Sequence, residues 1–299
     1  MSAFDQLHRF IFTQANVRGE LVRLDESLRS IVHSYEYPKQ IQRLLSEMAA
    51  ATSLLTATLK FEGEIALQIQ SKGPVSYAVI NATHDQTLRG VARWDDSLPS
   101  LPETFSELLT DAVLVMTITP DEGERYQGVV ALEKPTLAEC LEEYFTQSEQ
   151  LATRVHLMTD LANPDNAKAA GVLLQVLPTD ASATDVSQAT EFEHISTLTE
   201  TLSEEEMFTL SVNDILFRLY HQEDVELYPA QPVSFACTCS KERSAEALRH
   251  VAKEELMTII EEDGAIKMNC QYCHTEYAFD SIDVEAIHSG NHASSQTNQ

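Results

Sequence analysis

Four of the five cysteines lie in two tight pairs near the C-terminus, Cys237-x-Cys239 and Cys270-x-x-Cys273, with thirty residues between the pairs. Zinc prefers four soft donors in a tetrahedron, and two close pairs joined by a foldable loop supply them at low entropic cost. The pattern therefore predicts one zinc ion held by these four thiolates. Four small buried hydrophobic side chains, or a stable disulfide, are the less favoured interpretations.

A site with four thiolates has no open position for water, so its zinc is structural rather than catalytic. The pairs also permit a redox role. The α-carbons of Cys-x-Cys lie within the range of about 4.4–6.8 Å that a disulfide spans, and Cys-x-x-Cys closes more easily. Because bound thiolates are the form that oxidants attack, oxidation of either pair would remove two ligands at once.

The remaining candidate ligands have weaker support. His274 directly follows the second pair but is surplus, because four cysteines already complete the site. His288 and His292 lie in a polar C-terminal stretch. Cys140 lies on the apolar stripe of a predicted helix, which indicates a buried, unreactive thiol, with a regulatory role as the alternative.

The net charge of this 299-residue chain is −27, from 47 acidic and 20 basic residues. Nucleic acids and anionic membrane surfaces are recognised through Lys and Arg, so this charge argues against both as partners. The N-terminal stretch lacks the apolar core of a signal peptide, and no apolar run of about eighteen residues occurs. We therefore expect a cytoplasmic protein, in which clustered cysteines bind metal or react with oxidants more often than they form structural disulfides.

Residues 1–178 have the pattern of an α+β core domain. One helix is predicted from Pro38 onwards, and a capping box at Thr136 and Glu139 opens another. Alternating apolar residues predict strands in GEIALQIQS, GPVSYAVINAT, QTLRGVARW, VLVMTITP and YQGVVALE. The turn at Lys72-Gly73-Pro74 pairs the first two as a hairpin. A last apolar run, AAGVLLQVLP, ends the domain.

Residues 179–231 form a predicted helical linker. The stretch 178–236 contains twelve acidic residues and one basic residue, so we expect it to be only marginally stable. Its short amphipathic helices, one opened by a capping box at Ser203 and Glu206, need a neighbour to cover their apolar faces. Residues 232–287 follow as a small zinc domain with helical spacing over about 244–262, and 288–299 as a disordered tail.

Structural zinc contributes roughly 10–16 kcal/mol to the folding of small domains, whereas a whole domain is stable by only about 5–15 kcal/mol. Loss of the metal is therefore expected to unfold the zinc domain. If that domain holds the linker, the linker loosens as well and exposes its apolar helix faces.

Together these features resemble the heat-shock protein 33 family of bacterial redox-regulated holdase chaperones. The resemblance runs from about residue 4 to about residue 287 and includes, besides the thiol pairs, FEGEIALQIQSKGPV, YQGVVALE, LAECLEEYFTQSEQL, AAGVLLQVLP and TLTETLSEEEMFTLSVNDILFRLYH. It implies a core domain, a metastable linker and a zinc domain. It also implies that the protein is inactive while it is reduced, with zinc bound to Cys237, Cys239, Cys270 and Cys273. Oxidants such as hypochlorous acid would then form the disulfides Cys237–Cys239 and Cys270–Cys273, release zinc and unfold the linker.

The resemblance also implies that the chain is not an enzyme. Its oxidised form, commonly a homodimer, would bind unfolding client proteins without ATP and later pass them to ATP-dependent foldases. Two positions depart from the family pattern, since Ala152 stands where proline is usual and His274 stands where glycine usually follows the second pair. A side chain at 274 alters the turn beneath the sulfurs, which bears on the oxidation threshold rather than on metal binding.

Two other functions fit part of the pattern. A zinc-ribbon nucleic-acid binder would use similar cysteines, but residues 237–299 hold eleven acidic residues against five Lys or Arg. A thiol oxidoreductase would use Cys270 and Cys273, but no βαβ pattern surrounds them and bound zinc would mask the nucleophile.

Overall fold

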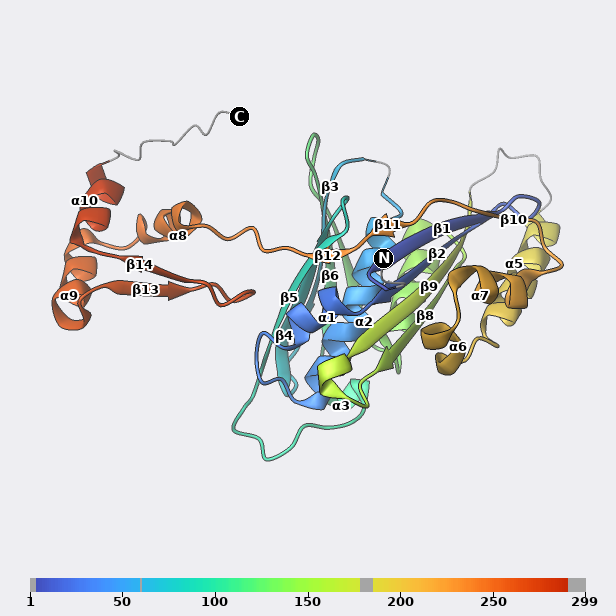
Figure 1. The fold of residues 1–299 in the computed structure, drawn as a ribbon, viewed down its shortest axis with the longest axis horizontal. Coiled ribbons are helices and arrows are strands. Elements are labelled where there is room, and N and C mark those ends of the chain that lie inside the picture. The colour runs from blue at the N-terminus through green and yellow to red at the C-terminus, as the bar shows by residue number, and fades with distance from the viewer. Residues whose placement is uncertain (1–3, 60, 178–184, 290–299) are drawn as a thin grey trace. The chain divides into compact units, whose positions relative to one another are not determined.

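A computed structural model describes residues 4–59, 61–177 and 185–289 (Figure 1). The chain divides into two compact units, Met1–Ala236 and Cys237–Gln299. Both contain helices and strands, which confirms the mixed α and β composition of the predicted fold class. Among the described residues, no helix has both the length and the apolar character needed to cross a bilayer.

The first sheet of the larger unit has the strand order β10-β1-β2-β9-β8, and β11 also pairs with β1. Its strands are β1 (Gln6–Phe12), β2 (Val17–Leu24), β8 (Thr153–Asp160), β9 (Lys168–Val176), β10 (Val225–Leu227) and β11 (Gln231–Pro232). Strands β1 and β2 are antiparallel, with Leu7 opposite Val22 and Phe10 opposite Gly19. Because side chains alternate along a strand, Leu7 and Phe10 point to opposite faces of this sheet.

The second sheet has the order β12-β5-β4-β3-β6-β7. Its strands are β3 (Gly63–Gln70), β4 (Val75–Thr83), β5 (Thr87–Trp94), β6 (Val113–Pro120), β7 (Tyr126–Ala131) and β12 (Ser234–Phe235). The predicted hairpin is confirmed, since β3 and β4 pair with Ile65 opposite Ala82. The three other strands predicted from alternation are β5, β6 and β7.

Helix α2 (Lys39–Thr56) lies between the two sheets (Figure 1). The predicted apolar face is buried, but so are small residues around the rest of the helix, including Ala49, Ala50 and Ser53. Small side chains let both sheets approach the helix closely, so α2 is enclosed rather than covered on one side. The other helical segments here are α1 (Glu26–Val32), α3 (Phe105–Leu108), α4 (Leu137–Tyr144), a π-helix η1 (Phe145–Glu149) and a 3₁₀ turn η2 (Pro164–Asn166).

The helix predicted in the segment LAECLEEYFTQSEQL differs from a continuous α-helix. Thr136 is its N-cap as predicted, with Oγ1 accepting a hydrogen bond from the Glu139 N–H at 3.2 Å. The Glu139 carboxylate accepts from the Thr136 hydroxyl at 2.8 Å, which differs from the predicted capping box, in which it would accept from the Thr136 N–H. The α-helix ends at Tyr144, and the wider turn η1 continues to Glu149. The Tyr144 hydroxyl donates to Glu149 Oε1 at 3.0 Å, which ties the wider turn to the end of α4.

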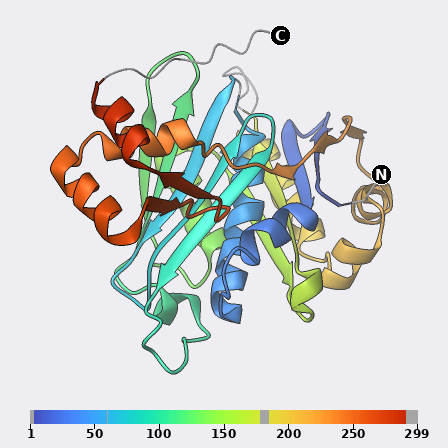
Figure 2. The same cartoon turned by 60° about the vertical axis from the view of Figure 1, so that its left-hand side comes forward.

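Helices α5 (Asp185–Thr199), α6 (Glu204–Thr209) and α7 (Val212–Tyr220), here called the linker helices, cover the face of the first sheet that points away from α2 (Figures 1 and 2). The sheet side of this contact consists of Phe10, Phe12, Val17, Leu21, Ala170, Val172 and Leu174. The linker helices contribute Phe192, Ile195, Met207, Val212, Ile215, Leu216 and Tyr220, and Leu202 joins them from the connection between α5 and α6. As expected, their apolar faces depend on a neighbour. The predicted linker residues 179–184 lie outside the described residues.

The smaller unit contains α8 (Lys241–Leu248), α9 (Lys253–Asp263), β13 (Ile266–Asn269), β14 (Glu276–Phe279) and α10 (Ser281–Ser289) (Figure 2). The helical spacing predicted over 244–262 corresponds to two helices, because the chain breaks between α8 and α9. The break lets Leu248 and Leu256 both reach one small core. Helix α10 extends beyond 288, where the tail was predicted to begin, and residues 290–299 lie outside the described part of the chain.

Candidate metal centre

The smaller unit brings all four predicted cysteines together. Cys237 and Cys239 lie just before α8, whereas Cys270 and Cys273 lie in the turn between β13 and β14. The four Sγ atoms lie within 4.8 Å of one another. Two of the distances join the pairs, at 3.5 Å from Cys237 to Cys270 and 3.4 Å from Cys239 to Cys273.

These distances fit a tetrahedral tetrathiolate site. Zinc–sulfur bonds of about 2.3 Å place the sulfurs of a tetrahedron about 3.8 Å apart, which lies inside the observed range. All four cysteines are free thiols, and all are partly buried. The donor set is soft and complete, so the residues present can hold a zinc ion without any contribution from His274.

The hairpin β13–β14 positions the second pair. Ile266 lies opposite Phe279 and Asn269 opposite Glu276, which leaves residues 270–275 as the connecting turn. The turn is closed by two backbone hydrogen bonds, from Cys270 N–H to Thr275 O at 3.0 Å and from His274 N–H to Cys270 O at 2.9 Å. These bonds fold the chain beneath the sulfurs of Cys270 and Cys273.

His274 has a φ of 58°, in the left-handed region that favours glycine. The departure of this residue from the family pattern therefore has a structural meaning, because a side chain stands where the turn requires left-handed backbone. Such a conformation costs a residue other than glycine about 1–2 kcal/mol.

We expect His274→Gly to stabilise the metal-loaded unit by roughly 0.5–1 kcal/mol, because the greater chain entropy of glycine offsets part of the relieved strain. The measurement is the urea concentration at which the protein releases its metal to a colorimetric chelator. Thr258→Gly, on an exposed position of α9, serves as the control and should lower that concentration. A lower midpoint for His274→Gly would show that the imidazole stabilises the turn.

The first pair is held by the start of α8. Ser240 is the N-cap of this helix and accepts a hydrogen bond from the Arg243 N–H at 3.2 Å. The Arg243 guanidinium reaches back and donates to Thr238 O at 2.9 Å and Thr238 Oγ1 at 2.7 Å. The residue between the two cysteines is therefore fixed by the helix that follows it.

Two further residues contact the sulfurs and were not predicted from the sequence as part of the site. The Tyr277 hydroxyl donates to Cys239 Sγ at 3.1 Å, and Thr275 Oγ1 lies 3.3 Å from Cys273 Sγ. Cys273, Thr275 and Tyr277 are spaced two residues apart, which is the spacing of side chains on one face of an extended segment. This spacing was the feature of the sequence that could have indicated Thr275 and Tyr277 as neighbours of the sulfurs.

We expect Tyr277→Phe to weaken metal binding about tenfold, since outer-shell hydrogen bonds typically contribute 10–100-fold to the affinity of metal sites. The phenol orients Cys239 and stabilises its thiolate. Competition with a chelator of known affinity measures the change. Tyr228→Phe is the matched control, because Tyr228 is an exposed tyrosine of the larger unit. Equal affinities for Tyr277→Phe and wild type would remove Tyr277 from the account.

The metal-free thiols differ in acidity. Partial burial raises the pKa of Cys273, but hydrogen bonds from the Thr275 side chain and backbone and from the other thiols outweigh it and lower this pKa to about 6. Burial raises the pKa of Cys237 to about 12. The hydrogen bond to Cys239 raises the pKa of Tyr277 to about 12. The lowered pKa of Cys273 favours its thiolate, the form that reacts with oxidants.

The apolar core around this centre is small. Its buried members are Ala245, Leu248, Leu256, Ile266, Phe279, Val284 and Ile287. A core of this size supplies little stability by itself, since units below about 70–80 residues usually need a metal or disulfides. The four sulfurs join the segment before α8 to the β13–β14 turn, so a bound metal would replace part of the missing core.

The other predicted candidates lie apart from the cluster. Cys140 is buried on α4, and desolvation raises its pKa, as expected for an unreactive thiol. His274 lies in the turn but is not among the clustered ligands. His288 lies in the last turn of α10, and His292 lies outside the described residues.

Comparisons with known proteins agree with one another. A family model described as "Hsp33 protein" matches residues 5–280. The 33 kDa chaperonin of Pseudoalteromonas atlantica is 64% identical over 291 residues, covering 97% of each chain. The 33 kDa chaperonin of Shewanella sediminis is 54% identical over 289 residues, again covering 97% of each chain. The crystal structure of the 33 kDa chaperonin (heat shock protein 33 homolog) from Thermotoga maritima has the same fold, with a TM-score of 0.78, 21% identity, and coverage of 96% of this chain and 98% of that one.

Proposed function

The chain belongs to the Hsp33 family, and from this membership we propose that it is a redox-regulated, ATP-independent holdase of the cytoplasm. The family and the relatives named 33 kDa chaperonin support an Hsp33-type chaperone. In the proposal the protein is not an enzyme. Its reduced, zinc-bound form is inactive, and oxidation converts it into a form that binds unfolding proteins and prevents their aggregation.

The observation that carries the proposal is the cluster of four sulfurs within 4.8 Å in a unit with a small core. When bound, zinc would hold these sulfurs as thiolates and cross-link the two segments that carry them. Cys237, Cys239, Cys270 and Cys273 are the proposed ligands. The same four residues are the proposed sensor, because their thiolates are the atoms that an oxidant attacks.

The proposed oxidation uses hypochlorous acid as a two-electron oxidant. The Cys273 thiolate attacks the chlorine, which forms an S–Cl bond and releases hydroxide. The Cys270 thiolate then attacks Cys273 Sγ and displaces chloride, which closes the Cys270–Cys273 disulfide. The same two steps at Cys237 and Cys239 close the second disulfide, so none of the four thiolates remains to hold a metal.

Along the chain, only residues 221–236 separate the end of α7 from the first cysteine of the metal centre. The chain between α7 and Cys237 is tied to the larger unit by the short strands β10, β11 and β12. Close to the first cysteine, the N–H groups of Ser234 and Ala236 donate to Gln86 O at 3.0 Å and Leu88 O at 3.1 Å. Such short pairings open easily, so unfolding of the smaller unit can spread backwards to α7.

Release of the linker helices would expose two apolar surfaces, their own inner faces and the outer face of the first sheet. These surfaces match the chemistry of the proposed partners, which are unfolded or aggregation-prone client proteins with exposed apolar side chains. The proposal includes a homodimer as the active form and transfer of clients to ATP-dependent foldases. With its charge of −27, the protein would remain soluble while these surfaces are exposed.

The experiment that tests the function treats reduced, zinc-loaded protein with hypochlorous acid. We expect zinc release and suppression of the aggregation of a thermally unfolding client to develop together. Mapping of the oxidised cysteines should give Cys237–Cys239 and Cys270–Cys273 rather than disulfides between the pairs. Equally strong suppression by the reduced, metal-loaded protein would contradict the switch.

A further inference from the structure

Arg23 is a buried arginine beneath the linker helices. It lies on β2, on the face of the first sheet that these helices cover, and only 3% of the residue is exposed. Its Nη1 donates to Leu210 O at 2.7 Å and to Met207 O at 3.3 Å. These carbonyls belong to the last turn of α6 and the residue that ends it. The guanidinium therefore contacts the linker directly.

The charge of Arg23 is poorly compensated. Among the described residues, no carboxylate lies within ion-pair distance of it, and its buried Nε has no hydrogen-bond partner. The guanidinium also lies over the ring of Phe4, whose centroid is 5.0 Å from Cζ. Desolvation lowers the pKa of Arg23, which is the physical sign of a charge removed from water without an anion nearby.

Two effects of opposite sign act on the docked state of Arg23. Hydrogen bonds to carbonyls favour the docked state, but one of the two is long. Burying a charge without an ionic partner disfavours that state, and replacing buried charged groups by apolar ones of similar size is often neutral or stabilising. When α6 leaves the sheet, water reaches the guanidinium and satisfies all its donors. The desolvation of the guanidinium therefore opposes the docking that its hydrogen bonds favour.

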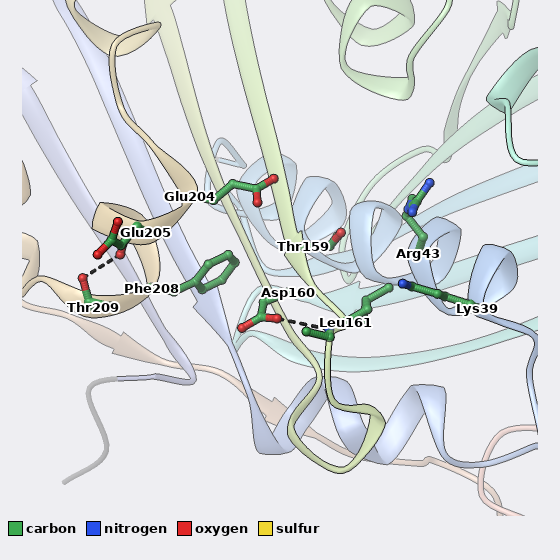
Figure 3. Close-up of a pocket in the computed structure, with 10 residues that line it drawn as sticks. Lys39, Arg43, Thr159, Asp160, Leu161, Glu204, Glu205, Phe208 and Thr209 are labelled. Carbon is green, nitrogen blue, oxygen red and sulfur yellow. Dashed lines mark hydrogen bonds between the residues drawn. The ribbon is translucent and has the colours of Figure 1, made fainter.

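The other side of α6 is also loosely packed. An open cavity of about 440 Å³ separates it from α2 and the end of β8 (Figure 3). Lys39 and Arg43 line the cavity from α2, and Glu204 and Glu205 line it from α6. Among the described residues, none of these cations lies within 4.0 Å of these carboxylates, so the opposite charges do not form ion pairs. Within α6 only Met207 is fully buried.

Helices α5 and α7 are fastened more firmly. The Tyr220 hydroxyl of α7 lies 2.6 Å from Thr199 Oγ1 at the end of α5, and both residues are buried. The Tyr220 ring also packs edge-on against Phe12, with centroids 4.8 Å apart. Helix α6 is held instead by the hydrogen bonds from Arg23 and by a partly exposed ion pair between its Glu206 and Arg218 of α7, 2.5 Å apart. Exposed ion pairs contribute little to stability, so α6 lacks the buried aromatic packing and the buried hydrogen bond that secure α5 and α7.

We propose that Arg23 is a built-in destabiliser of the docked linker and that α6 is the segment that detaches first. This inference names a residue that sets how easily the proposed switch opens, and it rests on the proposed function only for the consequence of opening. The destabilisation of docked α6 by Arg23 is itself a property of the reduced protein.

Amide hydrogen exchange of the reduced, metal-loaded protein tests the proposal without oxidant or client. In the wild type, amides of α6 should exchange at least about tenfold faster than those of α5 and α7. Arg23→Met keeps the length of the side chain and removes the charge, and it should slow exchange in α6 about tenfold. Arg23→Lys keeps a buried charge and should not slow it.

Arg89→Met is the matched control, because Arg89 is a strand arginine of the second sheet that pairs with Glu64. It should leave exchange in α6 unchanged. Unchanged or faster exchange in α6 of Arg23→Met would overturn the proposal and identify Arg23 as a clamp. Because the aggregation assay on oxidised wild-type protein tests the proposed function independently, failure of one proposal is distinguishable from failure of the other.

Discussion

Removal of the metal from the reduced protein by a chelator is expected to unfold residues 237–289 and to leave the two sheets of the larger unit folded. Within its described part, residues 237–289, the smaller unit buries seven apolar residues in its core, which supplies a few kcal/mol at most. Structural zinc contributes roughly 10–16 kcal/mol in comparable sites, which exceeds that supply. The larger unit has its own core around α2 and contains none of the four ligands.

Nuclear magnetic resonance of the chelated protein measures this difference directly. Signals from β13, β14 and α8–α10 should collapse into the range of an unfolded chain, whereas signals from β2, β3 and β9 should persist. Addition of zinc to the reduced protein should restore the first group. A chelated protein whose hairpin β13–β14 remains dispersed in the spectrum would show that the small core suffices without the metal.

Cys273→Ser is expected to uncouple chaperone activity from the oxidant. The variant loses one of four thiolates, so its metal affinity should fall by more than the 10–100-fold that loss of an outer-shell partner costs. It also cannot form the Cys270–Cys273 disulfide. Under reducing conditions it should contain little metal and already suppress client aggregation, and hypochlorous acid should add little. The measurements are metal content and client light scattering on the same sample.

Cys140→Ala is the matched control for this prediction. Cys140 is also a cysteine, but it is buried on α4 and lies outside the cluster. The control should keep a full complement of metal, remain inactive while reduced, and respond to hypochlorous acid as the wild type does. A Cys273→Ser protein that binds metal normally and stays inactive until oxidised would exclude Cys273 from both proposed roles.

The metal centre was predictable from the sequence because its information is local. Ligand type and spacing within each pair are sufficient to indicate a tetrathiolate site, and the structure places these sulfurs together. The hairpin β3–β4 was predictable for a similar reason, since one face of β3 is buried and the other half-exposed. Alternation is visible only when the two faces differ.

Strands β1 and β2 were missed because their two faces do not differ. Leu7 points towards the core around α2, whereas Phe10 points towards the linker helices, and both are buried. A sheet covered on both faces has no alternating pattern to read. The linker helices bury the outer face of β1 and β2 and so remove the alternation that would have indicated these strands. The strands could therefore not be predicted without knowing that the helices pack on them.

Long-range contacts account for the rest of what the sequence left open. Arg23 meets α6 across more than 180 residues, and no local pattern marks that contact. The strain at His274 depends on the turn that the hairpin closes. Its position directly after the second pair, where glycine is usual, already indicated an altered turn. The break between α8 and α9 depends on the core that Leu248 and Leu256 share.

One comparison tests most directly whether oxidation opens the linker, namely amide hydrogen exchange of the reduced, zinc-loaded protein against the same protein after hypochlorous acid. We predict that oxidation removes protection from 237–289 and from α5, α6 and α7, while β2, β3 and β9 stay protected. Retention of the reduced protein's protection in the linker helices of an oxidised, client-binding sample would contradict the account.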